Sequence, residues 1–280
     1  MGEKNKGRTV ANRIVIFGPY KTGTTGLFYR IRDSLSGNVR TLFESNEYVP
    51  EEGDAYRWIL AKTMLTLASP VKYDTFMDFD KQIYIVRDPR DWLVSGTLFI
   101  IQQDDSIYAD ENKFSEILAI LTQKERNPSS ISLLGILEEI MRRSNQHSFD
   151  RILSAIAQQY RWLPVFETQL GDYFLLKYEH FVDDRIKGLE KYLGIPLGGE
   201  GKVDRVHDHV IRTKGYGDWR NWFAAEDIDY FKPVFDEYIK LYGYSDDWRL
   251  NDRQIIRPEF CTKYVERVVS KRRNSSPHVS

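Results

Sequence analysis

Short apolar runs that stop at polar turns are the feature that most restricts the fold of this sequence. Arg13–Phe17 (RIVIF) ends at Gly18, and Gln82–Val86 (QIYIV) ends at an Arg-Asp-Pro-Arg turn. A helical pattern follows each turn. Runs of this length, rich in β-branched residues, are typical of strands buried on both faces, and strands that alternate with helices form parallel sheets. Ligands of such sheets bind beyond the carboxyl ends of the strands, where both turns lie.

The remaining segments continue this alternation. Further strands are predicted at Val39–Phe43 and Tyr173–Lys177, and a helical insert at about 103–165 with a break near Asn127. Other helices are predicted at Ala55–Leu60, Trp92–Ile101, Ile186–Leu193 and Glu226–Tyr242. The sequence therefore predicts an α/β fold with a doubly wound parallel sheet flanked by helices.

A single domain is expected over 13–255, by length and by the absence of a low-complexity linker. Residues 1–12 are predicted to be a flexible tail. Residues 256–280 form a C-terminal segment, and its basic, Ser-rich end, 271–280, is also predicted to be flexible.

Composition excludes several classes of function. The 280 residues include 40 Lys and Arg against 41 Asp and Glu, whereas nucleic-acid binding normally needs a basic excess. A single cysteine, Cys261, rules out an internal disulfide framework and a cysteine-rich zinc site. His207 and His209 form an isolated H-x-H, so no metal site is predicted. The polar N-terminus and the short apolar runs indicate a cytoplasmic protein without a membrane span.

The segment Gly18–Thr25 (GPYKTGTT) joins the first strand to a helix. Free N–H groups and the positive end of the helix dipole suit such a loop to phosphate, and the hydroxyls of Thr24 and Thr25 can donate as well. In nucleoside triphosphatases the lysine follows the second glycine directly. Here it is Lys21, which precedes Gly23. This favours a phosphate loop of another kind, with an ordinary strand–helix turn as the alternative.

The segment GPYKTGTTGLFYRI resembles the 5′-phosphosulfate loop of PAPS-dependent sulfotransferases, commonly P-K-S-G-T-T-W. The resemblance implies a P-loop-like nucleotide-binding fold and PAPS as the donor. It also implies that Lys21, Thr22 and Gly23–Thr25 contact the phosphosulfate. The family's tryptophan position is Gly26, which completes the predicted donor loop without a ring to stack on the nucleotide.

A second segment, IYIVRDPRDWLVSG, is similar to the family's 3′-phosphate segment. Arg87 and Ser95 have the family's spacing, and about two helical turns separate them, so both can reach one phosphate. A guanidinium binds phosphate through two parallel hydrogen bonds, and a hydroxyl adds an orienting bond. Taken alone, the same turn is also compatible with a solvated helix cap.

Two more segments carry the resemblance. LLKYEHF is similar to the family's strand ending in Y-E-D-L, which implies that Tyr178 contacts the adenine. IRTKGYGDWRNWF resembles the loop that closes over the 3′-phosphate, which implies that Arg212 and Lys214 bind it. The four segments stand in the family's order along the chain.

Sulfuryl transfer needs a cation at the leaving oxygen and a base at the acceptor. Lys21 is the expected cation. Cytosolic small-molecule members use the histidine of a K-T-H segment as base, but this chain keeps only the lysine, Lys62, and has Met64 at the histidine position. Glycan-type members use a glutamate near the end of the second strand. This implies Glu44 as the base, with Glu47 as competitor and Lys62 as a second cation; both glutamates are also compatible with plain surface positions.

The acceptor is expected to be a hydroxyl or amine of a small molecule or glycan, bound without a metal. Two other functions stay open. A P-loop kinase or hydrolase would need a strand-end carboxylate for magnesium, and Asp88 is the candidate. A non-catalytic PAPS-binding protein is the other, because Met64 cannot accept a proton. The oligomeric state is not predicted.

Overall fold

A computed structural model describes residues 11–51, 56–67, 71–204, 207 and 211–275. The chain divides into two compact units. We call Met1–Val86 with Phe166–Val203 the sheet unit, and Arg87–Val165 with Asp204–Ser280 the helical unit. Two compact units are compatible with one domain or with two, so the single domain over 13–255 stays a prediction.

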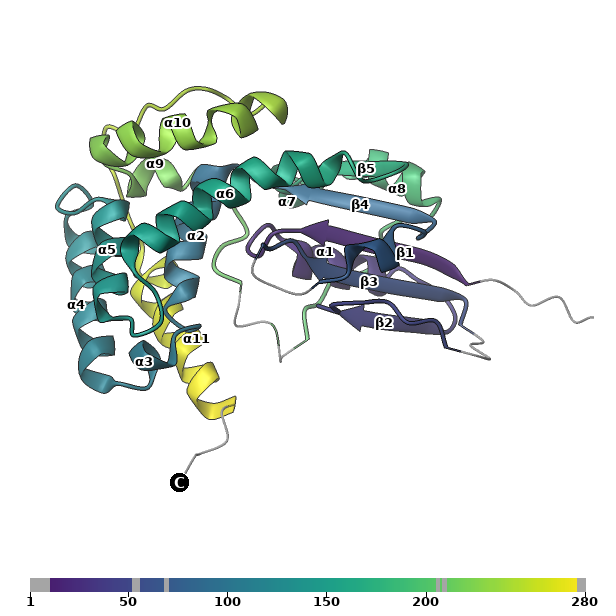
Figure 1. Ribbon diagram of the computed structural model, residues 1–280, viewed down its shortest axis with the longest axis horizontal. Coiled ribbons are helices and arrows are strands. Elements are labelled where there is room, and N and C mark those ends of the chain that lie inside the picture. Colours follow the sequence, from purple (N-terminus) through teal and green to yellow (C-terminus); the bar gives the residue numbers. More distant parts are fainter. Residues whose placement is uncertain (1–10, 52–55, 68–70, 205–206, 208–210, 276–280) are drawn as a thin grey trace, which may run out of the picture. The chain divides into compact units, whose positions relative to one another are not determined.

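The sheet unit is built on five parallel strands (Figure 1). Their order is β2-β3-β1-β4-β5, with β1 in the centre. The strands are β1 Asn12–Gly18, β2 Val39–Phe43, β3 Trp58–Met64, β4 Lys81–Val86 and β5 Tyr173–Lys177. The predicted α/β class with a parallel sheet is confirmed.

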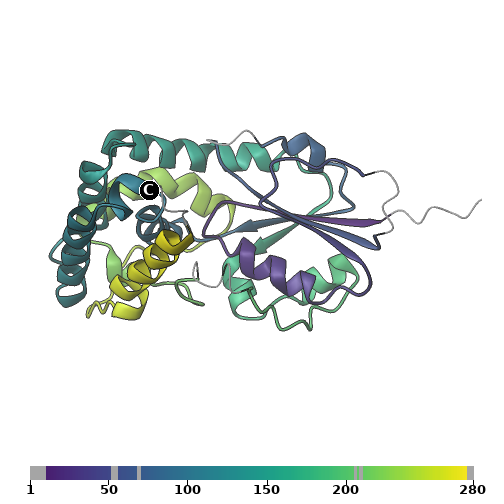
Figure 2. The ribbon, with the colours of Figure 1, turned by 90° about the horizontal axis from the view of Figure 1, so that it is seen from below.

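Apolar groups cover both faces of this sheet, because successive side chains of a strand point to opposite sides. Ile14 and Ile16 pack with the buried residues of α1 (Thr24–Arg32) and α8 (Lys187–Leu193) on one face; Figure 2 shows both helices on that side. On the other face, the Phe17 ring contacts Phe76 of the 3₁₀ helix η1 (Tyr73–Phe76). The core therefore lies in two layers around the sheet.

The predicted helix at Ala55–Leu60 is wrong over its described part, because Trp58–Met64 is strand β3; Ala55 itself lies outside the described residues. β3 is hydrogen-bonded to β1 on one side and to β2 on the other, and its interior residues are buried. This central position overrides the intrinsic helical preference of Ala and Leu. As a consequence, Lys62 lies near the carboxyl end of a strand, at the ligand edge of the sheet.

The helical unit holds most of the remaining helices. The predicted insert contains α3 to α6, and the unit also contains the helix after β4 and the C-terminal helices. Their bounds are α2 Pro89–Ile100, α3 Asp105–Tyr108, α4 Glu111–Arg126, α5 Leu133–Arg143, α6 Phe149–Glu167, α9 Trp219–Trp222, α10 Ala225–Leu241, η3 Pro258–Phe260 and α11 Thr262–Ser275. The last residues of α6 belong to the sheet unit, as does the short helix α7 (Tyr178–Val182).

Residues 271–275 are helical and not the flexible tail expected from their composition, because α11 runs to Ser275. Tyr264, Val265, Val268 and Val269 are buried and recur at helical spacing, so α11 has an apolar stripe that the charged residues between them obscured. Residues 276–280 and 1–10 lie outside the described part of the chain.

Asp227 caps two helices at once. Its carboxylate accepts hydrogen bonds from the N–H groups of Leu133 and Leu134, at the start of α5, at 2.9 and 2.8 Å. It also accepts from the N–H of Ala224, at the start of α10, at 2.7 Å. Burial raises the pKa of Asp227, whereas these three N–H groups and the charge of the buried Lys124 favour its ionised form.

Replacing Asp227 with alanine should lower the free energy of unfolding by about 2–4 kcal/mol, since each helix cap contributes about 1–2 kcal/mol. Urea unfolding followed by circular dichroism measures this. Asp229→Ala, at an exposed position of the same helix, is the matched control and should change the free energy by less than about 0.5 kcal/mol. Equal effects of the two substitutions would contradict the double cap.

Candidate active site

The loop between β1 and α1 is a tight turn at the ligand edge of the sheet. Gly23 is the N-cap of α1 and has a left-handed backbone, with φ of 89°. The buried hydroxyl of Thr22 donates to the carbonyl of Pro19 at 2.6 Å and so closes the turn. Lys21 also has positive φ, 63°, which is uncommon for a residue with a Cβ. Strained backbone of this kind concentrates at functional sites, and here it falls on the lysine that the sequence singled out.

Tyr178 and Phe181 of α7 pack against this loop and the helix after it. A Cβ on Gly23 would lie 2.4 Å from the ring of Tyr178, and one on Gly26 would lie 3.3 Å from the ring of Phe181. Both glycines thus allow α7 to approach closely. The contact of Tyr178 with adenine stays a prediction. Sequence reasoning missed Phe181, although it lies one helical turn after Tyr178 and therefore on the same face.

Lys62 joins the loop to the candidate base. Its Nζ donates to Glu44 Oε1 at 2.6 Å and to Thr25 Oγ1 at 3.0 Å, and it lies 4.1 Å from the centroid of the Phe43 ring. The Lys62 side chain is 1% exposed, whereas that of Glu44 is 50% exposed. The structure therefore brings together three residues that the sequence predicted for the site, from β3, the end of β2 and α1.

Burial and the ion pair with Glu44 act on Lys62 in opposite directions. Burial lowers the pKa of Lys62, and the charge and hydrogen bond of Glu44 oppose that shift. Glu44 keeps a half-exposed carboxylate, held by a left-handed backbone with φ of 55°. Because Thr25 Oγ1 accepts from Lys62, the Thr25 hydroxyl directs its own proton to another acceptor.

The competing carboxylate, Glu47, has a different partner. It pairs with Lys72, and both side chains are largely exposed. This ion pair raises the pKa of Lys72. Glu47 is exposed to about the same extent as Glu44, 44% against 50%, but its partner Lys72 is 64% exposed, whereas the partner of Glu44, Lys62, is 1% exposed. The two glutamates thus differ in the burial of their lysine partners, and the assignment of the base to Glu44 stays a prediction.

Arg212, in the helical unit, is a buried cation. Its Nη1 donates to Asp218 Oδ2 at 2.8 Å and to the carbonyl of Phe260 at 3.3 Å. Its Nε and Nη2 are buried and make no hydrogen bond within the part of the chain that the structure describes. Buried donors are normally hydrogen-bonded to protein, water or a ligand, and the role of Arg212 in phosphate binding stays a prediction.

Arg87 lies in the same unit as Arg212, and the charges of both arginines act on Tyr264. Arg87 follows β4 directly and is buried, as is Ser95 in α2. Burial raises the pKa of the Tyr264 hydroxyl, and the positive charges of Arg212, Arg267 and Arg87 oppose that shift. Tyr264, on α11, was not predicted, because the C-terminal segment 256–280 was given no role in the site.

Ser95 and Lys214 differ in exposure. Ser95 is 1% exposed, whereas Lys214 lies at an exposed position of the loop that follows Arg212. The 3′-phosphate roles of both residues stay predictions.

Asp88 is engaged as a structural group. It accepts from Arg90 Nε at 2.9 Å and from Arg90 Nη2 at 2.7 Å, and it caps α2 through the N–H of Arg90 at 3.0 Å. A magnesium ion at Asp88 would have to compete with this pair. Among the described residues, no group of three or more His, Cys, Asp or Glu is placed to hold a metal; His209 lies outside them. No helix of the described chain is long and apolar enough to cross a membrane.

Comparison with known proteins gives structural similarity only. No protein-family model and no curated protein matches the chain. The chain is similar to the mouse sulfotransferase SULT7A1 complexed with PAP, with 18% identity over 82% of this chain and 85% of that one, at a TM-score of 0.45. It is also similar to retinol dehydratase in complex with androsterone and inactive cofactor PAP, with 14% identity, 82% and 81% coverage and a TM-score of 0.42. At these values the function has to be inferred from the residues of this chain.

Proposed function

We propose that this chain is a sulfotransferase that moves a sulfuryl group from PAPS to a hydroxyl or amine of a small molecule or glycan. PAPS carries two separate anionic groups, a 5′-phosphosulfate and a 3′-phosphate. The buried Arg212, whose Nε and Nη2 make no hydrogen bond among the described residues, carries the proposal. It supports an anion site in the helical unit, in addition to the loop of Lys21 in the sheet unit.

The loop of the sheet unit is assigned to the 5′-phosphosulfate. Its support is the N-terminus of α1, with the hydroxyls of Thr24 and Thr25 and the ammonium of Lys21. The 3′-phosphate is assigned to Arg87 and Arg212, with Ser95 and Lys214. Arginine suits this role because its planar fork of donors matches two phosphate oxygens.

In the proposed reaction, the acceptor oxygen or nitrogen attacks sulfur in line with the bridging phosphate oxygen. A bond from the acceptor to sulfur forms, the bond from sulfur to that bridging oxygen breaks, and the electron pair leaves with 3′,5′-ADP. Lys21 stabilises the charge on the leaving oxygen, and Glu44 takes the acceptor proton. Lys62 orients Glu44 and Thr25 through the two hydrogen bonds that it donates.

The rival functions have less support. A P-loop kinase or hydrolase needs a lysine directly after Gly23 and a strand-end carboxylate for magnesium. Thr24 occupies the first position, and Arg90 occupies both oxygens of Asp88. A non-catalytic PAPS-binding protein is favoured only by Met64, and the buried Lys62 with Glu44 offers a base and a cation that a mere binding site does not need.

Calorimetric titration with 3′,5′-ADP tests the proposed donor. Binding should be the same with magnesium and with EDTA, and Arg87→Ala should weaken it about 100-fold, since a lost charge-assisted bidentate contact is worth about 3 kcal/mol. Arg249→Ala removes an exposed arginine of the same unit and should leave binding unchanged. Preference for ATP with magnesium over 3′,5′-ADP would overturn the proposal.

A further inference from the structure

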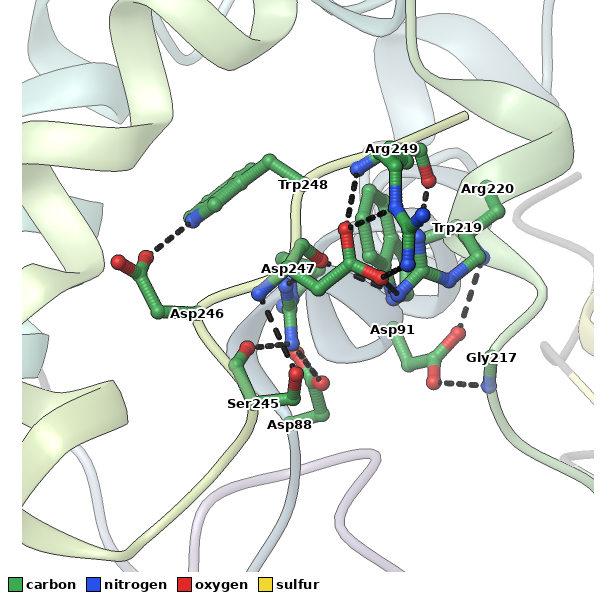
Figure 3. A network of polar contacts seen from close by, with 11 residues as sticks. Asp88, Asp91, Gly217, Trp219, Arg220, Ser245, Asp246, Asp247, Trp248 and Arg249 are labelled. Atoms are coloured by element: carbon green, nitrogen blue, oxygen red, sulfur yellow. Dashed lines mark hydrogen bonds and ion pairs between the residues drawn. The ribbon is translucent and has the colours of Figure 1, made fainter. Parts of the chain in front are cut away.

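Asp91 connects helix α2 to a distant loop. It is the third residue of α2, it is buried, and its carboxylate accepts two backbone hydrogen bonds (Figure 3). The N–H of Gly217 donates to Oδ2 at 2.5 Å and the N–H of Trp219 donates to Oδ1 at 3.1 Å. Both donors belong to the end of the segment 211–219, which we call the 211–219 loop and which contains Arg212.

The connection fixes the backbone of the loop tightly. Gly217 has a left-handed conformation, with φ of 79°, and a Cβ there would meet no atom within 4 Å. The glycine is therefore needed for its backbone angle and not for space. The Trp219 ring is buried, and the guanidinium carbon of Arg90 lies 4.3 Å from its centroid. Trp219 is thus held both through its backbone N–H, by Asp91, and through its ring, by Arg90.

The position of Arg212 follows from this anchor. Asp218 lies between the two residues whose N–H groups bind Asp91, and its Oδ2 accepts from Arg212 Nη1 at 2.8 Å. The same oxygen accepts from Trp222 Nε1 at 3.2 Å. Because one carboxylate holds the backbone on both sides of Asp218, it also sets where Asp218 holds the guanidinium of Arg212.

The charge of Asp91 acts on Arg87 as well. Burial raises the pKa of Asp91, the charge of Asp88 adds to that shift, and Arg87 opposes it together with the two backbone N–H groups. Asp91 is thus electrostatically linked to one of the two candidate phosphate arginines and bonded, through the loop, to the other.

We propose that Asp91 is a positioning residue for the 3′-phosphate of the donor, acting by holding the 211–219 loop in the arrangement that presents Arg212. This inference rests on the proposed function, because it takes Arg212 as a phosphate ligand. Asp91 itself does not contact the donor. Its loss should therefore reduce discrimination between nucleotides with and without a 3′-phosphate.

The test measures that discrimination as the Kd for 5′-AMP divided by the Kd for 3′,5′-ADP. Asp91→Asn should raise the Kd for 3′,5′-ADP about tenfold, because the amide NH₂ faces a backbone N–H and one charge-assisted bond is lost. The Kd for 5′-AMP should change less than about twofold. A role in stability alone would lower the melting temperature and leave the ratio unchanged.

Asp247→Asn is the matched control, because Asp247 binds Arg220 and Arg249 and lies in the same polar network (Figure 3). It should leave the ratio unchanged. Where Asp91→Asn does not fold, Gly217→Ala tests the same connection, because its Cβ strains the backbone that donates to Asp91. Gly217→Ala should reduce the ratio about as much as Asp91→Asn does.

A double variant decides whether Asp91 acts through Arg212. In an Arg212→Ala background, Asp91→Asn should have little further effect on the ratio, since residues in one network do not add. Full additivity, or an equal loss of affinity for both nucleotides, would overturn the inference and leave the proposed function standing. A wild-type protein that does not prefer 3′,5′-ADP over 5′-AMP would overturn both.

Discussion

Replacement of Lys21 by methionine is expected to lower turnover about a thousandfold, the loss typical when a group that stabilises transition-state charge is removed. The affinity for 3′,5′-ADP should fall less than about tenfold, because the loop N–H groups and hydroxyls remain. The reason is that the ammonium acts on charge that develops on the bridging oxygen only as the bond to sulfur breaks. Because 3′,5′-ADP has no such bond to break, its binding depends less on the Lys21 ammonium than the transition state does.

The backbone of Lys21 provides a second arm of this test. With φ of 63°, a glycine would relieve strain that a Cβ causes. The relief offsets the larger conformational entropy of glycine in the unfolded chain, so Lys21→Gly should change the free energy of unfolding by less than about 1 kcal/mol. It should nevertheless lose turnover as Lys21→Met does. If Lys21→Gly folds as stably as the wild type but loses turnover, the Lys21 side chain is needed for the reaction and not for the fold.

Turnover is measured as release of 3′,5′-ADP from PAPS, with a panel of simple phenols, alcohols and amines as acceptors. Lys72→Met is the matched control, because Lys72 is an exposed lysine of the same unit. It should retain wild-type turnover. If Lys21→Met were as active as the wild type, Lys21 would not be the cation at the leaving group.

Replacement of Glu44 by glutamine should reduce kcat about 10²- to 10⁴-fold, the usual contribution of a general base. Binding of 3′,5′-ADP should stay within about threefold of the wild type, because the carboxylate is assigned to the acceptor. Glu47→Gln should keep turnover within about twofold, since Glu47 pairs with Lys72 at the surface. A larger loss in Glu47→Gln than in Glu44→Gln would reverse the assignment.

Glu44→Gln also removes the ionic partner of Lys62, so a loss of activity has a second explanation. Glu44 raises the pKa of Lys62 against burial; without it this pKa should fall further, and the ammonium becomes easier to neutralise. Lys62→Met separates the two effects. If Glu44 only held Lys62, then Lys62→Met would reproduce the whole loss and the double variant would be no worse. We expect the double variant to be slower than Lys62→Met alone.

The elements that the sequence predicted well are those with a strong local pattern. The strands at Val39–Phe43 and Tyr173–Lys177 begin and end as predicted, because compact apolar runs between polar turns indicate a buried strand. Trp58–Met64 lacked such borders and contains helix-favouring residues, so its strand state depended on pairing with two neighbours. The apolar stripe of α11 was hidden for a similar reason, since basic residues dominate its composition.

The sequence by itself determined the chemistry of the loops. It placed Lys21, Gly23 and two threonines at a strand–helix turn, and an arginine after β4, because short stretches of chain fix turns and helix starts through local steric and hydrogen-bonding preferences.

Only the tertiary structure decided which side chains meet. The register of β2 against β3 aligns Phe43 with Lys62 and so brings Glu44 to the ammonium. Asp91 finds its two N–H partners well over a hundred residues away. Such contacts depend on strand order, burial and loop closure, and these are properties of the whole chain. No single segment of the sequence therefore predicts them.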